Sequence, residues 1–191
     1  MRRYALLALV LFAACLGPRQ DPSAFFLLSP VPPPAAESPV PVSIGLGPIA
    51  IPGYLDRPQV IVRLSDNEVA LSDADRWAEP LAANIARTLE ENLAALLPGS
   101  SYVAFPWYPS EAPDYGLALE FRRFEADSSG AVTLDATWSL GRAGAPIDGA
   151  EVRLGVPADG PGRGAAVAAH SRALAEFSRQ IAAAVRRAAG R

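Results

Sequence analysis

The side chains that most often carry out catalysis are scarce in this sequence and do not form a catalytic pattern. The 191 residues include one cysteine, Cys15, and one histidine, His170. The sequence has no G-x-S-x-G nucleophile motif, no cluster of His and Cys suited to zinc, and no calcium-loop spacing. The glycine-rich segment at 160–164 lacks the G-K-[S/T] ending of a phosphate-binding loop. These patterns predict a protein that is not an enzyme and that needs no metal or cofactor.

The remaining titratable candidates have simpler interpretations. His170 lies in a predicted helix over residues 165–189, and no partner motif accompanies it as a general base would require. We expect it to be a partly exposed helix residue. Asp73, Asp75 and Glu79 precede an apolar, helix-like stretch. We expect their negative charge to stabilise the N-terminus of that helix.

Cys15 has the position of a lipid-modified cysteine. Residues 1–14, MRRYALLALVLFAA, combine a positive start, an apolar stretch too short to cross a bilayer, and small residues directly before the cysteine. In bacterial lipoproteins with this lipobox arrangement, the signal peptide is cut after Ala14, the Cys15 thiol takes a diacylglycerol and the new amine is acylated. The alternative is an ordinary secretory signal with an incidental cysteine. Because several acyl chains anchor a protein stably, we expect a membrane-anchored mature chain.

The residue after the cysteine bears on which membrane holds the anchor. In the enterobacterial sorting pattern, an aspartate at this position retains a lipoprotein in the inner membrane. Here the residue is Leu16. We therefore expect the periplasmic face of the outer membrane, with inner-membrane anchoring as the less favoured alternative.

Composition narrows the class of protein further. The formal net charge is −3, and without Arg2 and Arg3 of the signal peptide it becomes 15 minus 20, or −5. This acidic balance argues against a nucleic-acid partner. Half of the residues are apolar, so a folded core is expected. A single cysteine excludes an internal disulfide.

The mature chain is predicted to consist of a linker followed by one domain. Residues 15–41 carry eight prolines and are expected to form a semi-rigid, extended spacer. The apolar run AFFLLS at 24–29 interrupts this spacer, and we interpret it as a short strand that docks on a sheet. The alternative is an apolar patch close to the membrane. Residues 42–191 are predicted to form the domain.

Hydrophobic periodicity predicts an α+β fold for this domain. Apolar residues recur every three to four positions over about 77–97 and 165–189, which indicates two long amphipathic helices. Strands are indicated near 42–46, 59–64, 68–71, 101–106, 115–121, 132–140 and 152–156. The clear alternation within 115–121 and 132–140 predicts an antiparallel hairpin. We expect a two-layer sandwich in which the two helices cover a mostly antiparallel sheet.

The loop between the strands near 42–46 and 59–64 is the candidate binding element. It contains Tyr54, Leu55, Asp56 and Arg57, and Trp77 follows where the first helix is expected to begin. Tyr, Trp and Arg are the residue types that dominate protein interfaces, and functional residues concentrate on constrained loops. We therefore consider these five residues as a partner-binding surface. The structural alternative is that Asp56 and Arg57 pair with each other while Trp77 joins helix to sheet.

Two sequence blocks in this region carry a family resemblance. The segment GPIAIPGYLDRPQVIVR at 47–63 and the segment RWAEPL at 76–81 resemble the PqiC-like lipoproteins, auxiliary components of ABC-type transport systems. The resemblance covers nearly the whole mature chain. It implies a non-enzymatic subunit that works with a periplasmic MCE-domain protein, supports lipid movement between the inner and outer membranes, and maintains membrane integrity. A ring of several copies would suit the end of an MCE tunnel.

Two other functions remain open at this point. The first is a periplasmic lipoprotein enzyme, for example a hydrolase, which the shortage of catalytic motifs argues against. The second is a solute-binding lipoprotein. One α+β domain in about 177 mature residues lacks the two lobes that usually close around a solute.

Overall fold

The computed structural model describes residues 23–31, 33, 38–108, 110 and 112–190. The predicted signal peptide 1–14, the candidate lipidation site Cys15 and several prolines of the spacer lie outside these residues. Eight strands and two helices are present in the described part. The strands are β1 (Ala24–Phe26), β2 (Ser43–Ala50), β3 (Gln59–Ser65), β4 (Glu68–Trp77), β5 (Ser101–Ala104), β6 (Tyr115–Asp127), β7 (Val132–Arg142) and β8 (Ala145–Val156). The helices are α2 (Leu81–Leu96) and α3 (Arg163–Ala188).

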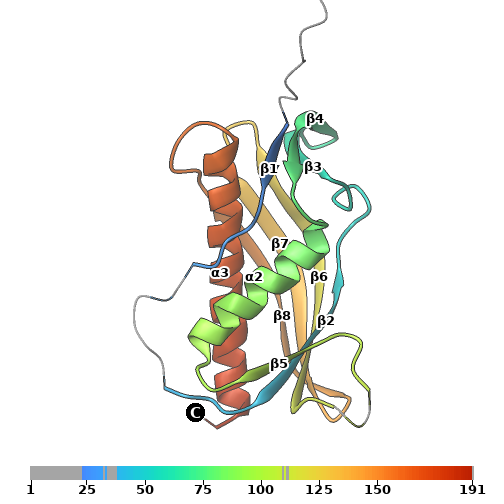
Figure 1. Ribbon diagram of the computed structural model, residues 1–191, viewed down its shortest axis with the longest axis vertical. Helices are drawn as coiled ribbons and strands as arrows, with labels where there is room; N and C mark the ends of the chain where they lie inside the picture. Colours follow the sequence, from blue (N-terminus) through green and yellow to red (C-terminus); the bar gives the residue numbers. More distant parts are fainter. Residues whose placement is uncertain (1–22, 32, 34–37, 109, 111, 191) are drawn as a thin grey trace, which may run out of the picture.

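The long strand β6 occupies a central position in one eight-stranded sheet (Figure 1). Along one side it forms an antiparallel hairpin with β7, which pairs in turn with β8. Along its other side the first part of β6 pairs with β2, whereas its last two residues pair with β3. β5 extends the sheet beyond β2, and β4 and β1 extend it beyond β3. The sheet therefore divides into two branches on the side of β6 away from β7.

The prediction of a mostly antiparallel sheet is wrong, because the sheet is mixed and four of its seven strand pairings are parallel. The antiparallel hairpin β6–β7 was predicted correctly, and β8, expected as a strand near 152–156, extends it. The error arises at residues 51–58, which connect β2 to β3 without folding them into a hairpin. Both strands instead run in the direction of β6 and pair with different parts of it. Alternation within a strand does not reveal which strand it joins.

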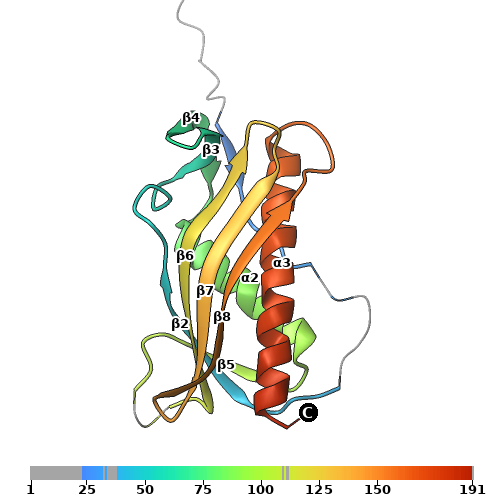
Figure 2. The ribbon, with the colours of Figure 1, turned by 180° about the vertical axis from the view of Figure 1, so that it is seen from behind.

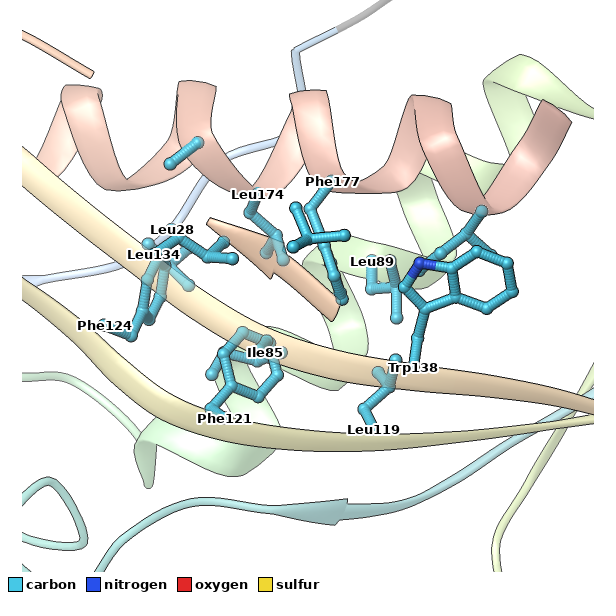
Figure 3. Packing of buried hydrophobic residues seen from close by; sticks show 14 of the residues in the cluster. Leu28, Ile85, Leu89, Leu119, Phe121, Phe124, Leu134, Trp138, Leu174 and Phe177 are labelled. Carbon is cyan, nitrogen blue, oxygen red and sulfur yellow. The ribbon is translucent and has the colours of Figure 1, made fainter. Parts of the chain in front are cut away.

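Both helices cover one face of the sheet, and the other face is seen uncovered in Figure 2. The core lies between the sheet and the helices. Figure 3 shows Phe121 and Phe124 of β6 facing Leu174 and Phe177 of α3, with Ile85 of α2 close by. All five side chains are buried. A helical stripe and an alternating strand face thus bury each other, as their sequence periods predict.

The first helix begins later than its pattern predicts. Trp77 is the last residue of β4, and α2 begins at Leu81, after Pro80 at the N-cap position. Proline disfavours helical backbone in the residue before it, so Glu79 does not join the helix. Asp73 and Asp75 consequently lie in β4 and not at a helix N-terminus. β4 continues to Trp77 because it has partners on both sides, β3 and β1.

The apolar run at 24–29 forms a strand, as predicted, but a shorter one. Phe26 pairs with Trp77, and the chain after it is held by side chains of both helices. The backbone N–H groups of Leu28 and Val31 donate to Asn84 and Asn92 of α2 at 3.1 and 2.9 Å. The N–H of Ser29 donates to Ser171 of α3 at 3.1 Å. Residues 24–31 are therefore an integral part of the fold.

Candidate partner-binding pocket

The loop at 51–58 is closed by backbone hydrogen bonds. The N–H of Leu55 donates to the Pro52 carbonyl at 2.9 Å, and the N–H of Arg57 donates to the Leu55 carbonyl at 2.9 Å. At the end of the loop, the N–H of Trp77 donates to the Pro58 carbonyl at 2.7 Å. The last bond brings the loop and the junction between β4 and α2 together. The two sequence blocks that carry the family resemblance therefore meet in space.

Tyr54 points inward and is bound to the sheet. Its hydroxyl donates to Glu125 Oε2 at 2.7 Å, and the Arg63 guanidinium lies over its ring, 5.8 Å from the centroid. Burial, together with the neighbouring Glu125 carboxylate, raises the pKa of Tyr54 to about 12. The adjacent Leu55 is almost wholly buried in the core. Both residues hold the loop, Leu55 with almost no exposed surface and Tyr54 half-buried. Their role in partner contact stays a prediction.

Glu125 is the group that holds this part of the loop. Its side chain is fully buried, and Oε1 accepts from Arg63 Nε at 2.6 Å and from Arg123 Nε at 2.9 Å. Burial alone would raise the pKa of Glu125, but the hydrogen bonds from Arg63, Tyr54 and Arg123 outweigh it and keep the pKa below its ordinary value. We call Tyr54, Arg63, Arg123 and Glu125 the carboxylate cluster.

Asp56 and Arg57 point away from this cluster. Together with Pro58 they form one wall of a surface pocket of about 350 Å³, and the segment from Trp77 to Pro80 forms the other. Within the described part of the chain, neither side chain has a hydrogen-bond or ion-pair partner, so the predicted local pair between them is absent. The Nε atom of Arg57 is buried and has no acceptor. We call this the loop pocket.

Trp77 is buried and forms part of one wall of the loop pocket, and core side chains pack against its ring. Its ring meets the ring of His170 edge to face, with centroids 5.6 Å apart. Phe124 contacts the same imidazole from another side, at 4.9 Å. The prediction that His170 is partly exposed is wrong, since it is 1 % exposed. Burial lowers its pKa to about 4, which keeps the imidazole neutral at physiological pH.

The pocket also has a charged rim. Glu79 accepts from Arg87 Nε at 3.0 Å, and Arg87 reaches Glu91 at 3.1 Å and the Leu28 carbonyl at 3.1 Å. The charge of Glu79 is therefore compensated, whereas the side chains of Arg57 and Asp56 have no partner within the described residues. An unpaired guanidinium beside an indole and two prolines suits a carboxylate next to an apolar group.

A second pocket, of about 420 Å³, lies where β2, β6 and β7 meet the loop after β5. It is lined mainly by glycine, alanine and proline, with the Trp107 ring at one side. It has no charged side chain among its lining residues and no nucleophile beyond Ser139. No group of metal-ligating side chains occurs within the described ranges. Among the same residues, no helix is long and apolar enough to span a bilayer.

Sequence reasoning missed Glu125. Strict alternation from Phe121 would place Arg123 and Glu125 on the apolar face of β6. A register shift between Phe121 and Arg123 breaks the alternation, and Phe124 takes the next core position. The available signal was a carboxylate placed between the apolar residues Phe124 and Ala126. Lipidation of Cys15 stays a prediction, because this residue is not among those described.

Comparisons with known proteins give a family and a fold. The family model described as "ABC-type transport auxiliary lipoprotein component" matches residues 26–182. No curated protein sequence matches the chain significantly. One solved structure, described only as an uncharacterized protein, has 22% identity and a TM-score of 0.72, covering 85% of this chain and 98% of its own. A Xanthomonas campestris protein described with the family model DUF330 has 19% identity and a TM-score of 0.68, covering 84% and 93%.

A third solved structure is more distant. The PelC dodecamer from Paraburkholderia phytofirmans has 13% identity and a TM-score of 0.40, with 80% of this chain and 91% of its own covered. This likeness is too weak to carry an argument about assembly. The first two similarities concern the fold alone.

Proposed function

The chain belongs to the family of ABC-type transport auxiliary lipoprotein components, and we propose that it is a non-enzymatic, lipid-anchored subunit of an envelope transport system. In this proposal Cys15 anchors the protein at the periplasmic face of the outer membrane. The folded body binds a periplasmic MCE-domain protein of the same system. The complex supports lipid movement between the two membranes and so maintains membrane integrity.

The loop pocket is the observation that supports a binding role most directly. Its two walls come from the sequence blocks at 47–63 and 76–81. Its charged side chains, the exposed Asp56 and the half-buried Arg57, are unpaired within the described residues. A buried donor without an acceptor is unfavourable by about 1–3 kcal/mol, so an incoming acceptor would relieve that cost. The carboxylate cluster holds the loop that forms one wall of the pocket, and His170 packs against Trp77 of the other wall. Rigid support lowers the entropy lost when a partner binds.

Crosslinking in cells tests this proposal. The C-terminally tagged protein is crosslinked, solubilised in detergent and captured, and its partners are identified by mass spectrometry. We expect an MCE-domain protein with the unmodified chain, and loss of that protein with Arg57→Glu. Glu120→Gln on β6 and Arg179→Gln on α3 are matched controls, because both residues are exposed charges outside the loop pocket. Capture of the protein without any transport component would remove the assignment.

A genetic experiment tests the consequence for the envelope. Deletion of the gene is expected to increase permeability to large antibiotics and to disturb lipid asymmetry under membrane stress. Complementation with the Cys15→Ala variant should fail, because the folded body would no longer be held at the membrane. Unchanged permeability and asymmetry after deletion, under every membrane stress tested, would contradict a role in membrane integrity.

A further inference from the structure

The large hydrophobic side chains that are exposed in the described part of the chain belong to two sets of segments. These segments lie at opposite ends of the molecule (Figures 1 and 2). One group lies at the end where β1 begins and where β3 turns into β4. It consists of Phe25, Leu27, Leu64 and Leu71, which are 64%, 48%, 49% and 50% exposed. We call it the anchor-end patch. The other group lies beyond β5 and at the start of β8, and consists of Phe105, Tyr108 and Ile147.

Phe25, Leu64 and Leu71 lie on three strands that are neighbours, and Leu27 directly follows β1, where it borders α3. β1 pairs with β4, and β4 pairs with β3. β1 is held firmly in this place, because Phe26 pairs with Trp77 and the following residues are hydrogen-bonded to both helices. The position of Phe25 and Leu27 is therefore set by the fold. Their exposure does not result from a loose chain end.

The length of chain before β1 determines what can reach this patch. Only seven residues separate Cys15 from Ser23. Eight extended Cα–Cα steps cover at most about 28 Å, so an anchor at Cys15 keeps the start of β1 within that distance of the bilayer surface. A tether this short gives the membrane a high effective concentration at the patch.

We propose that the anchor-end patch rests in the interfacial layer of the membrane that holds the lipid anchor, with Leu64, Leu71, Phe25 and Leu27 in contact with lipid. This inference rests on the lipid anchoring in the proposed function but not on the transport partner. Exposed apolar side chains next to an acyl anchor add a second membrane contact, because each buried apolar group adds to the attachment. The patch would also fix the direction in which the rest of the body points.

The charges around the patch indicate which bilayer surface it fits. The turn between β3 and β4 exposes Asp66, and Glu68 and Asp73 are exposed in β4. The neighbouring cations, Arg63 and Arg76, are half-buried and donate to the backbone carbonyls of Asp66 and Asp73. Carboxylates at headgroup level are repelled by an anionic leaflet and tolerated by a neutral one. The bilayer surface that the anchor-end patch fits is therefore one of zwitterionic phospholipid.

A fluorescence experiment with the lipidated full-length mature chain tests this proposal. Because the chain has one cysteine and lipidation consumes its thiol, an introduced cysteine is the only site for a fluorophore. Leu71→Cys carries the probe in the patch, and Leu64→Cys is a second position in case the first does not fold. Ile147→Cys is the matched control at the far end, since Ile147 is 47% exposed and Leu71 is 50% exposed.

The labelled proteins are placed in phosphatidylcholine vesicles that contain a nitroxide-bearing phospholipid. We expect the lipid quencher to reduce the emission at position 71 at least threefold more than at position 147, and aqueous iodide to act in the opposite order. Equal quenching at the two positions would overturn the proposal. Protection of position 71 from both quenchers would also overturn it, because the patch would then be covered by protein, for example a second copy.

Mass spectrometry of the purified chain separates the two possible failures. A chain without lipid at Cys15 would show that the anchoring itself is wrong. A lipidated chain whose position 71 is not quenched would leave the anchor in place and remove the membrane contact. Stronger quenching at position 71 in phosphatidylglycerol than in phosphatidylcholine vesicles would overturn the assignment of a neutral surface.

Discussion

Two halves of one short loop differ in how they use their side chains. Tyr54 and Leu55 are directed into the fold, where the Tyr54 hydroxyl binds Glu125 and Leu55 is buried. Asp56 and Arg57 follow directly, yet their side chains have no partner among the described residues and line the loop pocket. The first half fixes the conformation in which the second half is displayed. In this interpretation, loss of the first half affects stability, whereas loss of the second half affects binding.

The comparison extends to the other wall of the pocket. Trp77 is 5% exposed and rests on the buried, neutral ring of His170. Ala78 and Pro80, which follow in the same segment, are exposed. On each side of the pocket, residues directed into the core (Tyr54 and Leu55, or Trp77) are therefore followed by residues directed outward. The predictions below test this division, and they are ordered from the largest expected effect to the smallest.

The largest effect is expected from removal of the carboxylate in the cluster. Glu125→Ala would leave Arg63 and Arg123 without their shared acceptor, and we expect it to lower the free energy of unfolding by about 3 kcal/mol. Chemical denaturation measures the change. The control is Glu120→Ala, an exposed position on the same strand, with an expected change below about 0.5 kcal/mol. Equal effects at the two positions would show that the carboxylate cluster does not hold the loop.

Truncation of the buried loop residue should have the next largest effect. Leu55→Ala removes a side chain that is 1% exposed and leaves a cavity, so we expect a loss of about 2.5 kcal/mol. The same denaturation measurement applies. If Leu55→Ala were as mild as Asp56→Ala, which alters an exposed side chain, the proposed difference between the two halves of the loop would not exist.

The pH dependence of the free energy of unfolding should reveal the burial of His170, whose ring packs against Trp77. In the unfolded chain His170 has an ordinary pKa near 6.5, whereas burial lowers it to about 4 in the folded protein. The unfolded state therefore binds more protons between these values, and stability falls as the pH decreases. We expect a loss of about 2 kcal/mol between pH 7 and pH 5. Glu125, whose folded pKa is below its ordinary value, would add its loss only at lower pH.

Denaturant titrations at pH 7, 6 and 5 measure this loss. The His170→Gln variant is the control, because it lacks the titrating group and should show a much flatter dependence over the same range. A decline of the same size in both proteins would assign the effect to other groups.

A smaller loss is expected from the Tyr54 hydroxyl alone. Tyr54→Phe removes the hydrogen bond to Glu125 but leaves Arg63 and Arg123 on the carboxylate, so we expect a loss of about 1 kcal/mol. The ring that packs under Arg63 is kept. Partner capture should be almost unchanged when the variant is folded. A complete loss of capture by the folded variant would place Tyr54 in the binding surface after all.

The smallest effect on stability should come from the outward half. Asp56→Asn and Arg57→Gln are each expected to change the free energy of unfolding by less than about 0.5 kcal/mol. Arg57→Gln should nevertheless reduce partner capture, because the guanidinium is the pocket's unpaired cation. Unfolding and capture are measured on the same preparations. Normal capture by both variants would exclude the loop pocket as the contact surface.

Several elements could be predicted from local sequence because their signals are local. The helix ending at Ala188 and the strand β7 match their expected ranges closely, since a helical stripe or an alternating face persists over many residues. The hairpin partner β6 was predicted as a strand but extends six residues beyond the expected end at 121. The strand at 24–26 was found because turn-forming residues bound its apolar run. The start of α2 was missed, because Trp77 and Leu81 fit a helical stripe although Pro80 separates strand from helix.

The sequence by itself determined the periodic elements, the family and the positions of the two blocks that carry the family resemblance, because each of these depends on residues close together in the chain. Only the tertiary structure decided that β2 and β3 both run parallel to β6, since pairing across the sheet depends on long-range contacts. It also decided that Glu125 and His170 are buried. Burial depends on what covers a side chain, here a loop some 70 residues distant and a tryptophan from β4. The loop pocket exists only because those contacts bring two separate segments together.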